Sequence, residues 1–350
     1  MDTVLERVRD CIRKMHGYVP GKQPAEGQYV KLNTNENPYP PSPVVMEALR
    51  QAVNEDLRYY SDPLATPLRE EAARHYGCAT EEVVVGNGSD DVLTMIFRTF
   101  LDAGDVLVTP SPSYSLYQVL GNLQAAEYRE ISMGPAYTLP EGLDACHAKL
   151  IFVVNPNAPT GVLHPTEALR DLLRRSDSMV VLDEAYADFA GQSAIDLLSE
   201  FPNLIVVRTF SKSYALAGMR LGLGFARREV IAQMMKVKDS YNLDRLAIVA
   251  GCAALRDQEW LRKTTDRIIA TRTSTLEALA SMGLHVPPSR SNFVFPRIPD
   301  GRAAETHRLL EERRILVRYF NAPPTSDSLR VTVGTDDDMT TFTETLKTLL

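Results

Sequence analysis

Short runs of almost only apolar residues recur through the middle of the chain, separated by longer stretches of mixed polarity. The first run is Val83-Val84-Val85, and similar runs occupy residues 105–108, 150–154, 179–182, 204–207 and 221–225. A strand that is covered on both faces needs apolar side chains on both, as in parallel sheets packed between helices. The pattern therefore predicts a large α/β domain with a mostly parallel sheet.

Helix signals lie before and after the first apolar run. Ser42-Pro43 and Thr66-Pro67 each place an N-cap residue before a proline suited to the first helical position, and the second helix is expected to end at Gly77. The turn Gly86-Asn87-Gly88-Ser89-Asp90 precedes a stretch with helical apolar spacing that reaches Phe100. We therefore expect a strand, a glycine-rich turn and a helix in this order.

The two ends of the chain have different patterns. Apolar positions between Val4 and Met15 fall on one helical face, which predicts a helix, and the glycines and proline at 17–21 then predict an extended arm. After Arg245 the pattern changes to long helical stretches, followed by short strands at 292–295, 315–318 and 329–333. These features predict a smaller α+β domain. The expected division is an N-terminal arm that joins the small domain (1–40), the large domain (41–244) and the small C-terminal domain (245–350).

Composition narrows the class of protein. A chain of 350 residues is long enough for two domains, and 44% hydrophobic residues are enough for a sizeable core. The formal net charge of −7, without a long run of like charge, argues against nucleic acid as a partner. The sequence contains neither a long apolar segment nor a signal peptide pattern, so we expect a cytoplasmic protein that does not span a membrane. Four separated cysteines and six scattered histidines predict neither disulfides nor a metal site.

Several polar residues follow the apolar runs, where open α/β sheets bind ligands. Lys212 and Arg220 lie beyond the run at 204–207, Asp183 ends the run at 179–182, and Asn155 ends the run at 150–154. Taken singly, each is ambiguous: a loop lysine is usually solvated, and an arginine usually forms a surface ion pair. The aspartate could cap a core segment and the asparagine could belong to a turn. A buried amine could act as a nucleophile, a guanidinium could bind phosphate, and a helix-opening glycine turn could bind an anion.

The combination is more specific than its parts. The chain contains, in this order, the glycine-rich turn at 86–90, the loop that begins at Asn155, Asp183 with Tyr186 three residues later, and Lys212 with Arg220 eight residues later. This order is typical of one family. The sequence resembles the fold-type I pyridoxal-phosphate aminotransferases over nearly the whole chain. Within them it is most similar to the histidinol-phosphate aminotransferases, through LNTNENP (32–38), YSDP (60–63), TFSKSYALAGMRLG (209–222) and LRVTVGT (329–335). The resemblance implies a seven-stranded sheet between helices.

The resemblance also implies roles for individual residues. Lys212 would form a Schiff base with pyridoxal 5'-phosphate and move the proton, Asp183 would hold the ring nitrogen protonated, and Tyr186 and Asn155 would bind the phenolic oxygen. The residues expected around the phosphate are Gly88, Ser89, Asp90, Thr209, Ser211 and Arg220. Tyr114 would stack on the ring, and Tyr60, or Tyr59 beside it, would reach the cofactor of the neighbouring subunit. The residues expected to bind substrate are Tyr18, Asn35, Arg318 and Arg330.

The implied function is transamination between histidinol phosphate and 2-oxoglutarate, yielding glutamate, in histidine biosynthesis, by a homodimer with shared active sites. One departure from the family is Ala158, where many relatives have a second Asn. Three alternatives remain open. The chain could be a threonine-phosphate decarboxylase, which would usually have Pro where Ala217 stands, an aromatic or branched-chain aminotransferase, or a cofactor-binding protein without turnover.

Overall fold

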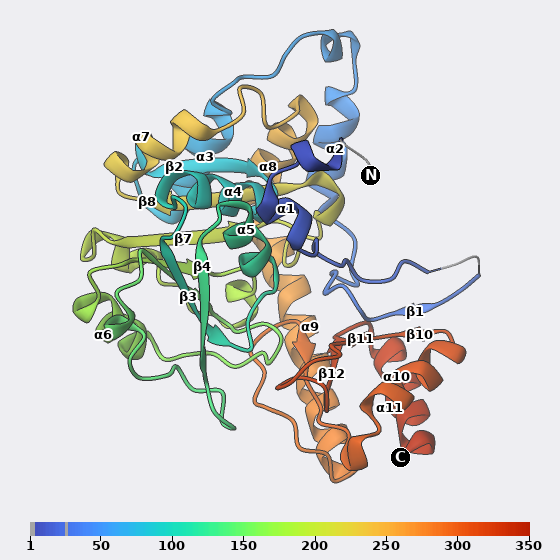
Figure 1. Ribbon diagram of the computed structural model, residues 1–350. Helices are drawn as coiled ribbons and strands as arrows, with labels where there is room; N and C mark the ends of the chain where they lie inside the picture. Colours follow the sequence, from blue (N-terminus) through green and yellow to red (C-terminus); the bar gives the residue numbers. More distant parts are fainter. Residues whose placement is uncertain (1–3, 25–26) are drawn as a thin grey trace.

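The computed structural model describes residues 4–24 and 27–350. Its larger part is built on a seven-stranded sheet packed between two layers of helices (Figure 1). The strands of this sheet are β2 (Val83–Asn87), β3 (Val106–Ser111), β4 (Glu127–Ser132), β5 (Leu150–Val154), β6 (Met179–Asp183), β7 (Leu204–Thr209) and β8 (Leu221–Ala226). Their order is β2-β8-β7-β6-β5-β3-β4, and β8 runs antiparallel to both of its neighbours while the other pairs are parallel. The predicted mostly parallel sheet is confirmed.

The apolar runs became buried strands because both faces of the sheet are covered. Along β5, Ile151 and Val153 belong to one core cluster, whereas Leu150, Phe152 and Val154 belong to the other. The first core contains side chains of α3 (Thr66–Tyr76), α6 (Thr166–Arg175) and α8 (Arg245–Arg256), with α2 (Pro43–Ala52) packed on α8. The second core contains side chains of α4 (Ser89–Phe100), α5 (Leu116–Leu123) and α7 (Arg228–Val237).

Strand β4 has no apolar run and was not predicted individually. Its sequence, EYREIS, carries alternating charges, and most of its side chains are exposed or half-buried. It pairs with β3 alone, in the register Val106 with Glu127, at the edge of the sheet. An edge strand tolerates charged side chains because it is open to solvent on one side.

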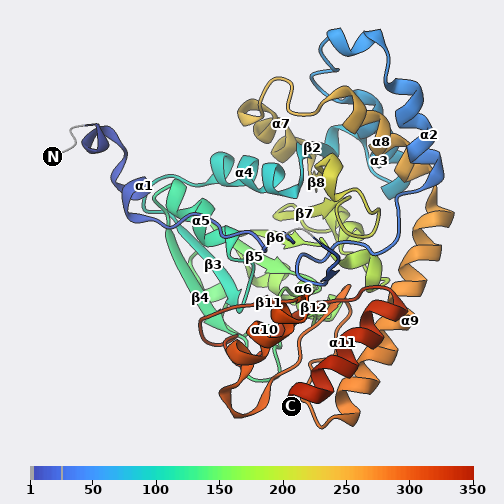
Figure 2. The ribbon, with the colours of Figure 1, turned by 90° about the vertical axis from the view of Figure 1, so that its right-hand side faces the viewer.

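The smaller part of the molecule is a helical layer against a three-stranded antiparallel sheet of order β11-β12-β9. Its elements are α9 (Gln258–Ser281), β9 (Phe293–Val294), α10 (Ala303–Glu312), β10 (Ile315–Leu316), β11 (Arg318–Tyr319), β12 (Leu329–Thr332) and α11 (Asp336–Leu349). Figure 2 shows α9 and α11 packed side by side. β1 (Val30–Lys31) pairs in parallel with β10, which ties the N-terminal arm to this part. The boundary expected at residue 245 stays a prediction, and α8, which begins there, packs on α2 and α3.

The predicted N-terminal helix is wrong as one continuous element. The described part has a short 3-10 turn at Leu5–Arg7 and a separate helix α1 (Asp10–Lys14), with extended backbone at Val8 between them. Neither piece has a buried residue, and α1 packs against α5 (Figure 2). The apolar side chains of Val8, Cys11, Ile12 and Met15 are only half-buried, so the segment lacks the full burial that stabilises most short helices.

Two helix starts were predicted from Ser/Thr-Pro pairs, and one of them has a different cap. The Ser42 hydroxyl accepts the Val44 N–H at 3.0 Å, as expected for an N-cap. Helix α3 begins at Thr66 itself, so Thr66 is not the cap; the carboxylate of Asp62 accepts its N–H at 3.0 Å. Asp62 thus satisfies a donor left free at the helix start.

The strand directions bring several strand ends to one edge of the sheet. The carboxyl ends of β2, β6 and β7 lie at the same edge, and the antiparallel β8 starts there, so Arg220, which precedes β8, reaches it too. Among the described residues, no helix is both long and apolar enough to cross a membrane.

Gly222→Ala is expected to destabilise this edge. A Cβ at Gly222 would lie 2.4 Å from both the Gly88 carbonyl carbon and the Ser89 nitrogen, which are backbone atoms that cannot rotate away. We expect a loss of about 1–3 kcal/mol in the free energy of unfolding, measured by urea titration. Gly218→Ala, where a Cβ meets nothing within 4 Å, is the matched control. Equal urea midpoints for the two variants would contradict the close packing.

Candidate functional site

A cavity of about 310 Å³ lies at the carboxyl edge of the large sheet. Its walls come from the strand ends, the N-terminal arm and loop, and strands β11 and β12 of the smaller part. The structure brings most of the predicted site residues together on these walls, although they come from distant parts of the sequence. The predicted residues that line the cavity are Tyr18, Asn35, Ser89, Asp90, Tyr114, Asp183, Tyr186, Thr209, Ser211, Lys212, Arg220, Arg318 and Arg330.

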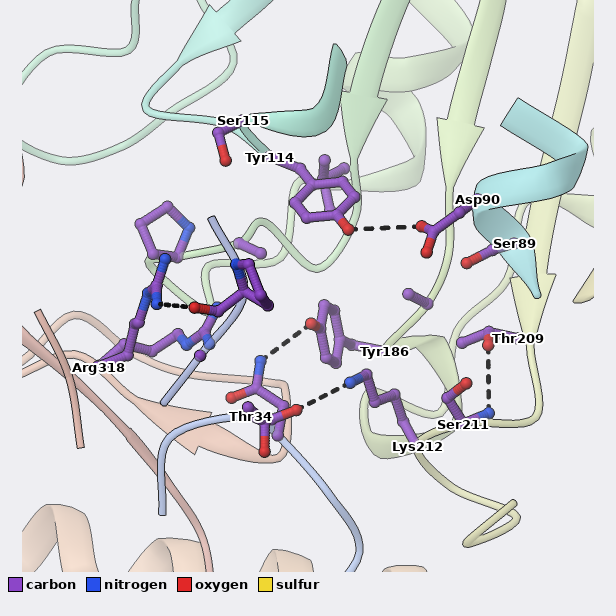
Figure 3. Close-up of a pocket in the computed structure, with 18 of the residues that line it drawn as sticks. Thr34, Ser89, Asp90, Tyr114, Ser115, Tyr186, Thr209, Ser211, Lys212 and Arg318 are labelled. Atoms are coloured by element: carbon purple, nitrogen blue, oxygen red, sulfur yellow. Dashed lines mark hydrogen bonds between the residues drawn. The ribbon is translucent and has the colours of Figure 1, made fainter. Parts of the chain in front are cut away.

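Lys212 follows β7 and points into the cavity, where its Nζ donates to the Thr34 carbonyl at 3.0 Å (Figure 3). Burial lowers the pKa of this amine to about 8, and the positive charge of Arg330 adds to the effect. The buried environment disfavours the ammonium form. A substantial fraction of the amine is therefore neutral, and nucleophilic, near neutral pH.

Asp183 ends β6 and is 4% exposed. Its Oδ2 accepts the Tyr117 hydroxyl at 2.7 Å, and its Oδ1 accepts the Ala185 N–H at 3.1 Å. Both donors are neutral, and burial raises the pKa of this carboxyl to about 6. A cationic ligand group placed against it would relieve the cost of burying the charge.

One end of the cavity is suited to an anion. Helix α4 begins at Ser89 with free N–H groups, and Arg220 lies across it, with Nη2 3.2 Å from Asp90 Oδ2. The hydroxyls of Thr209 and Ser211 face the same region, as Figure 3 shows. Gly88 does not line the cavity, but a Cβ there would lie 2.4 Å from Arg220 Nη2. The absence of a side chain at Gly88 therefore lets the arginine approach the turn.

A second cationic region lies at the opposite end, where Figure 3 shows Arg318 far from Ser89. Arg318 and Arg330 are directly paired across strands β11 and β12. Arg330 donates Nη2 to the Asn33 carbonyl at 3.0 Å, while its buried Nε has no partner. Arg318 donates to the carbonyls of Val19 and Pro20 in the arm, at 2.8 and 3.1 Å. An anionic ligand would supply the acceptor that Arg330 Nε lacks.

Aromatic rings and an amide close the middle of the cavity. Asn35 Nδ2 donates to the Tyr186 hydroxyl at 2.9 Å, so loop and strand end are joined there. Tyr18 from the arm meets the ring of Tyr114 edge-on, with centroids 5.8 Å apart. These contacts connect the N-terminal arm to the strand-end residues.

Besides Gly88, two other predicted residues, Asn155 and Tyr60, lie outside the cavity. The amide of Asn155 is bonded to the main chain of His164, with Oδ1 accepting its N–H at 2.7 Å. Asn155 therefore holds its own loop, and Ala158 of that loop lines the cavity instead. Tyr60 is 81% exposed and stacks on Tyr241 with centroids 4.4 Å apart.

Sequence reasoning missed Tyr117, Thr34 and Glu36. Tyr117 lies three residues after Tyr114, which itself lies just before α5, and this spacing could have indicated that the two rings are neighbours. Glu36 lines the cavity and pairs with Lys31 at 2.7 Å, but nothing in its motif distinguished it from the neighbouring asparagines. Thr34 acts through its carbonyl, which no side-chain pattern reveals. In the part of the chain that the structure describes, no cluster of three or more His, Cys, Asp or Glu side chains could hold a metal ion.

Comparison with known proteins agrees with this arrangement. The model of the class I and II aminotransferase family matches residues 27–346. The histidinol-phosphate aminotransferase of Syntrophotalea carbinolica is 46% identical over 333 residues, which cover 95% of this chain and 96% of the relative. That of Chromohalobacter salexigens is 45% identical over 342 residues, with 96% and 97% covered.

A solved structure shares the whole fold. Histidinol-phosphate aminotransferase from Sinorhizobium meliloti, in complex with pyridoxal-5'-phosphate, has a TM-score of 0.90 and 27% identity over 98% of both chains. Because the family model spans residues 27–346 and a relative matched over nearly its whole length is 46% identical, the chain belongs to the class I and II aminotransferases.

Proposed function

We propose that this protein is a pyridoxal-phosphate-dependent aminotransferase that exchanges the amino group between histidinol phosphate and 2-oxoglutarate in histidine biosynthesis. The observation that supports it best is a buried amine, Lys212, between two cationic regions at opposite ends of one cavity. One region suits the cofactor phosphate and the other suits the anionic end of each substrate. Relatives that match over nearly the full chain carry the same activity in their names.

The residues present fit the cofactor. When bound, pyridoxal phosphate supplies an electron sink for the bonds at the substrate's Cα. Its phosphate suits the α4 N-terminus with Arg220, and its ring nitrogen, when protonated, is the cation that the buried Asp183 lacks. Tyr186 can donate to the phenolic oxygen, and Tyr114 presents its ring to the cavity. Asn155 was expected beside Tyr186, but its amide is occupied by His164.

Lys212 performs the proton transfer in this proposal. Its amine would hold the cofactor when the cofactor is bound, and the free amine would take a proton from the substrate's Cα. A group with a pKa near 8 both accepts and returns a proton at neutral pH. The Thr34 carbonyl, 3.0 Å from Nζ, keeps the amine on the arm side of the cavity.

The substrate preference follows from charge. Arg318 and Arg330 are neighbours across two strands, so they present two guanidinium groups to one anion. A phosphate monoester carries more negative charge than a carboxylate and uses both, whereas 2-oxoglutarate binds the same region through a carboxylate. Tyr18 and Asn35 cover this region from the arm and the loop. An aromatic or branched-chain amino acid would leave one guanidinium without an anion.

We further propose a homodimer in which Tyr60 completes the partner's site. Tyr59 and Tyr60 are 57% and 81% exposed, and Val53, Leu57 and Leu64 around them are exposed apolar side chains as well. So much exposed apolar surface in one segment is typical of an interface. A second copy of this chain is the occupant we propose.

Replacement of Lys212 tests the assignment of the amine. Lys212→Ala is expected to lose measurable multiple turnover, since no other lysine lines the cavity in the described structure. Lys236→Ala, which removes a lysine of α7 outside the cavity, is the matched control and should keep full activity.

A panel of amino donors tests the substrate. The assay supplies 2-oxoglutarate with histidinol phosphate, threonine phosphate, phenylalanine or tyrosine in turn. We expect histidinol phosphate to give the highest kcat/KM. Substantial turnover by Lys212→Ala, or decarboxylation of threonine phosphate as the main activity, would contradict the proposal.

The pH dependence of cofactor attachment tests the environment of Lys212. Attachment needs the neutral amine, so its rate should rise about tenfold per pH unit below pH 8 and level off above it. The cofactor-free protein is mixed with pyridoxal phosphate between pH 6 and 10, and the adduct is trapped with borohydride. An ordinary lysine would instead give a rate that still rises at pH 10. Such a profile would show that the amine is not desolvated.

Subunit mixing tests the shared site. A chain carrying Tyr60→Phe and Lys212→Ala is mixed with wild type, so that the wild-type lysine faces a phenylalanine from the partner. If the hydroxyl contributes about 1 kcal/mol to phosphate binding, that site should hold the cofactor about fivefold more weakly. Heterodimers made with Lys212→Ala alone are the control, and a Tyr59→Phe version distinguishes the two tyrosines. An active monomer in sedimentation would refute the shared site.

A further inference from the structure

Tyr117 is a fully buried tyrosine that takes no part in the cavity walls. It lies in α5, and its hydroxyl donates to Asp183 Oδ2 at 2.7 Å. A buried hydroxyl must find a partner, and the carboxylate is the partner that this one has. The bond therefore joins α5 to the end of β6, behind the cavity.

The surrounding rings fix the position of this hydroxyl. The Tyr117 ring packs edge-on against Tyr114, with centroids 5.6 Å apart and planes at 86°, and against Phe152 at 4.7 Å. Tyr114 lies three residues earlier, just before α5, and lines the cavity. The ring is thus held on two sides, with its hydroxyl oxygen placed at the strand end, where the O–H donates to Asp183.

Asp183 is in an environment that opposes its charge. Besides burial, the negative charges of Asp90 from α4 and of the adjacent Glu184 raise the pKa of Asp183. Tyr186 is a further titratable group near Asp183. The Tyr117 hydroxyl and the Ala185 N–H act in the opposite direction. Burial beside Asp183 raises the pKa of Tyr117 itself, so the phenol stays a donor over the whole working pH range.

We propose that Tyr117 is a positioning residue that orients the Asp183 carboxylate and keeps it weakly basic, so that the proton between Asp183 and the cofactor stays on the ring nitrogen. This inference rests on the proposed pairing of Asp183 with that nitrogen. Without the phenol, the carboxylate attracts the shared proton more strongly. The proton then moves from nitrogen to oxygen, the ring loses its positive charge, and the electron sink weakens.

Tyr117→Phe removes only the oxygen atom and is the first test. Loss of a hydrogen bond to a charged group should raise the pKa of Asp183 by about one to two units. In the wild type, affinity for pyridoxal phosphate should fall as the pH drops below about 6, because Asp183 then becomes protonated. In Tyr117→Phe this fall should begin about one to two units higher. Nitrogen NMR of ring-labelled pyridoxal phosphate should show a smaller fraction of protonated ring nitrogen at pH 7.

A substitution that strengthens the donor gives the opposite shift. A fluorinated tyrosine at position 117 keeps the ring and makes the O–H more acidic, so the fall in affinity should move to lower pH. This variant also decides the matter if Tyr117→Phe folds poorly. Tyr128→Phe is the matched control, since its hydroxyl contacts Thr109 and Glu130 rather than Asp183.

The variant Asp183→Ala separates the two proposals. If it loses the protonated ring nitrogen while both Tyr117 variants keep the wild-type pH profile and NMR signal, the role of Tyr117 is overturned and the proposed function stands. If Asp183→Ala also keeps the wild-type signal, the pairing itself is refuted. Opposite shifts in the two Tyr117 variants, with no shift in Tyr128→Phe, support the positioning role.

Discussion

A carboxylate buried at the end of a central strand is the constraint on which the site depends. Asp183 lies in the core with only the neutral donors Tyr117 and Ala185, an arrangement that is costly unless a cation completes it. A protonated ring nitrogen is such a cation. In the proposed function, the cofactor would be held by the same charge that otherwise reduces the stability of the fold.

A second network of buried polar side chains fixes the chain next to Lys212. Arg208 is almost fully buried and pairs with Glu184 at 3.0 Å and with Asp188. Asp188 also accepts the hydroxyl of Ser213, whose carbonyl accepts the Asn37 amide at 2.9 Å. The residue beside Lys212 is therefore fixed from two sides. A buried pair of this kind is a weak source of stability, but it defines geometry when every member is satisfied.

The two cationic ends of the cavity have different origins. Arg220 reaches its place because β8 runs antiparallel and starts at the edge where the other strands end. Arg318 and Arg330 come from the smaller part, and Arg318 is bonded to the arm carbonyls of Val19 and Pro20. An anion that binds Arg318 must share it with the arm. If Arg318 binds substrate as proposed, substrate binding and arm position would be coupled through this one guanidinium.

The sequence by itself determined the elements whose stability is local or whose burial is complete. The apolar runs predicted the buried strands, and strand-end polarity together with family resemblance selected Lys212 and Asp183 as candidate site residues. The sequence could not determine the features that depend on contacts between residues distant along the chain. The edge strand β4 forms without an apolar run, and the apolar stripe of the N-terminal segment is only half-buried. Tertiary packing also turned the amide of Asn155 toward His164 and placed the Tyr117 hydroxyl on Asp183, because hydrogen-bond partners are chosen by proximity in space.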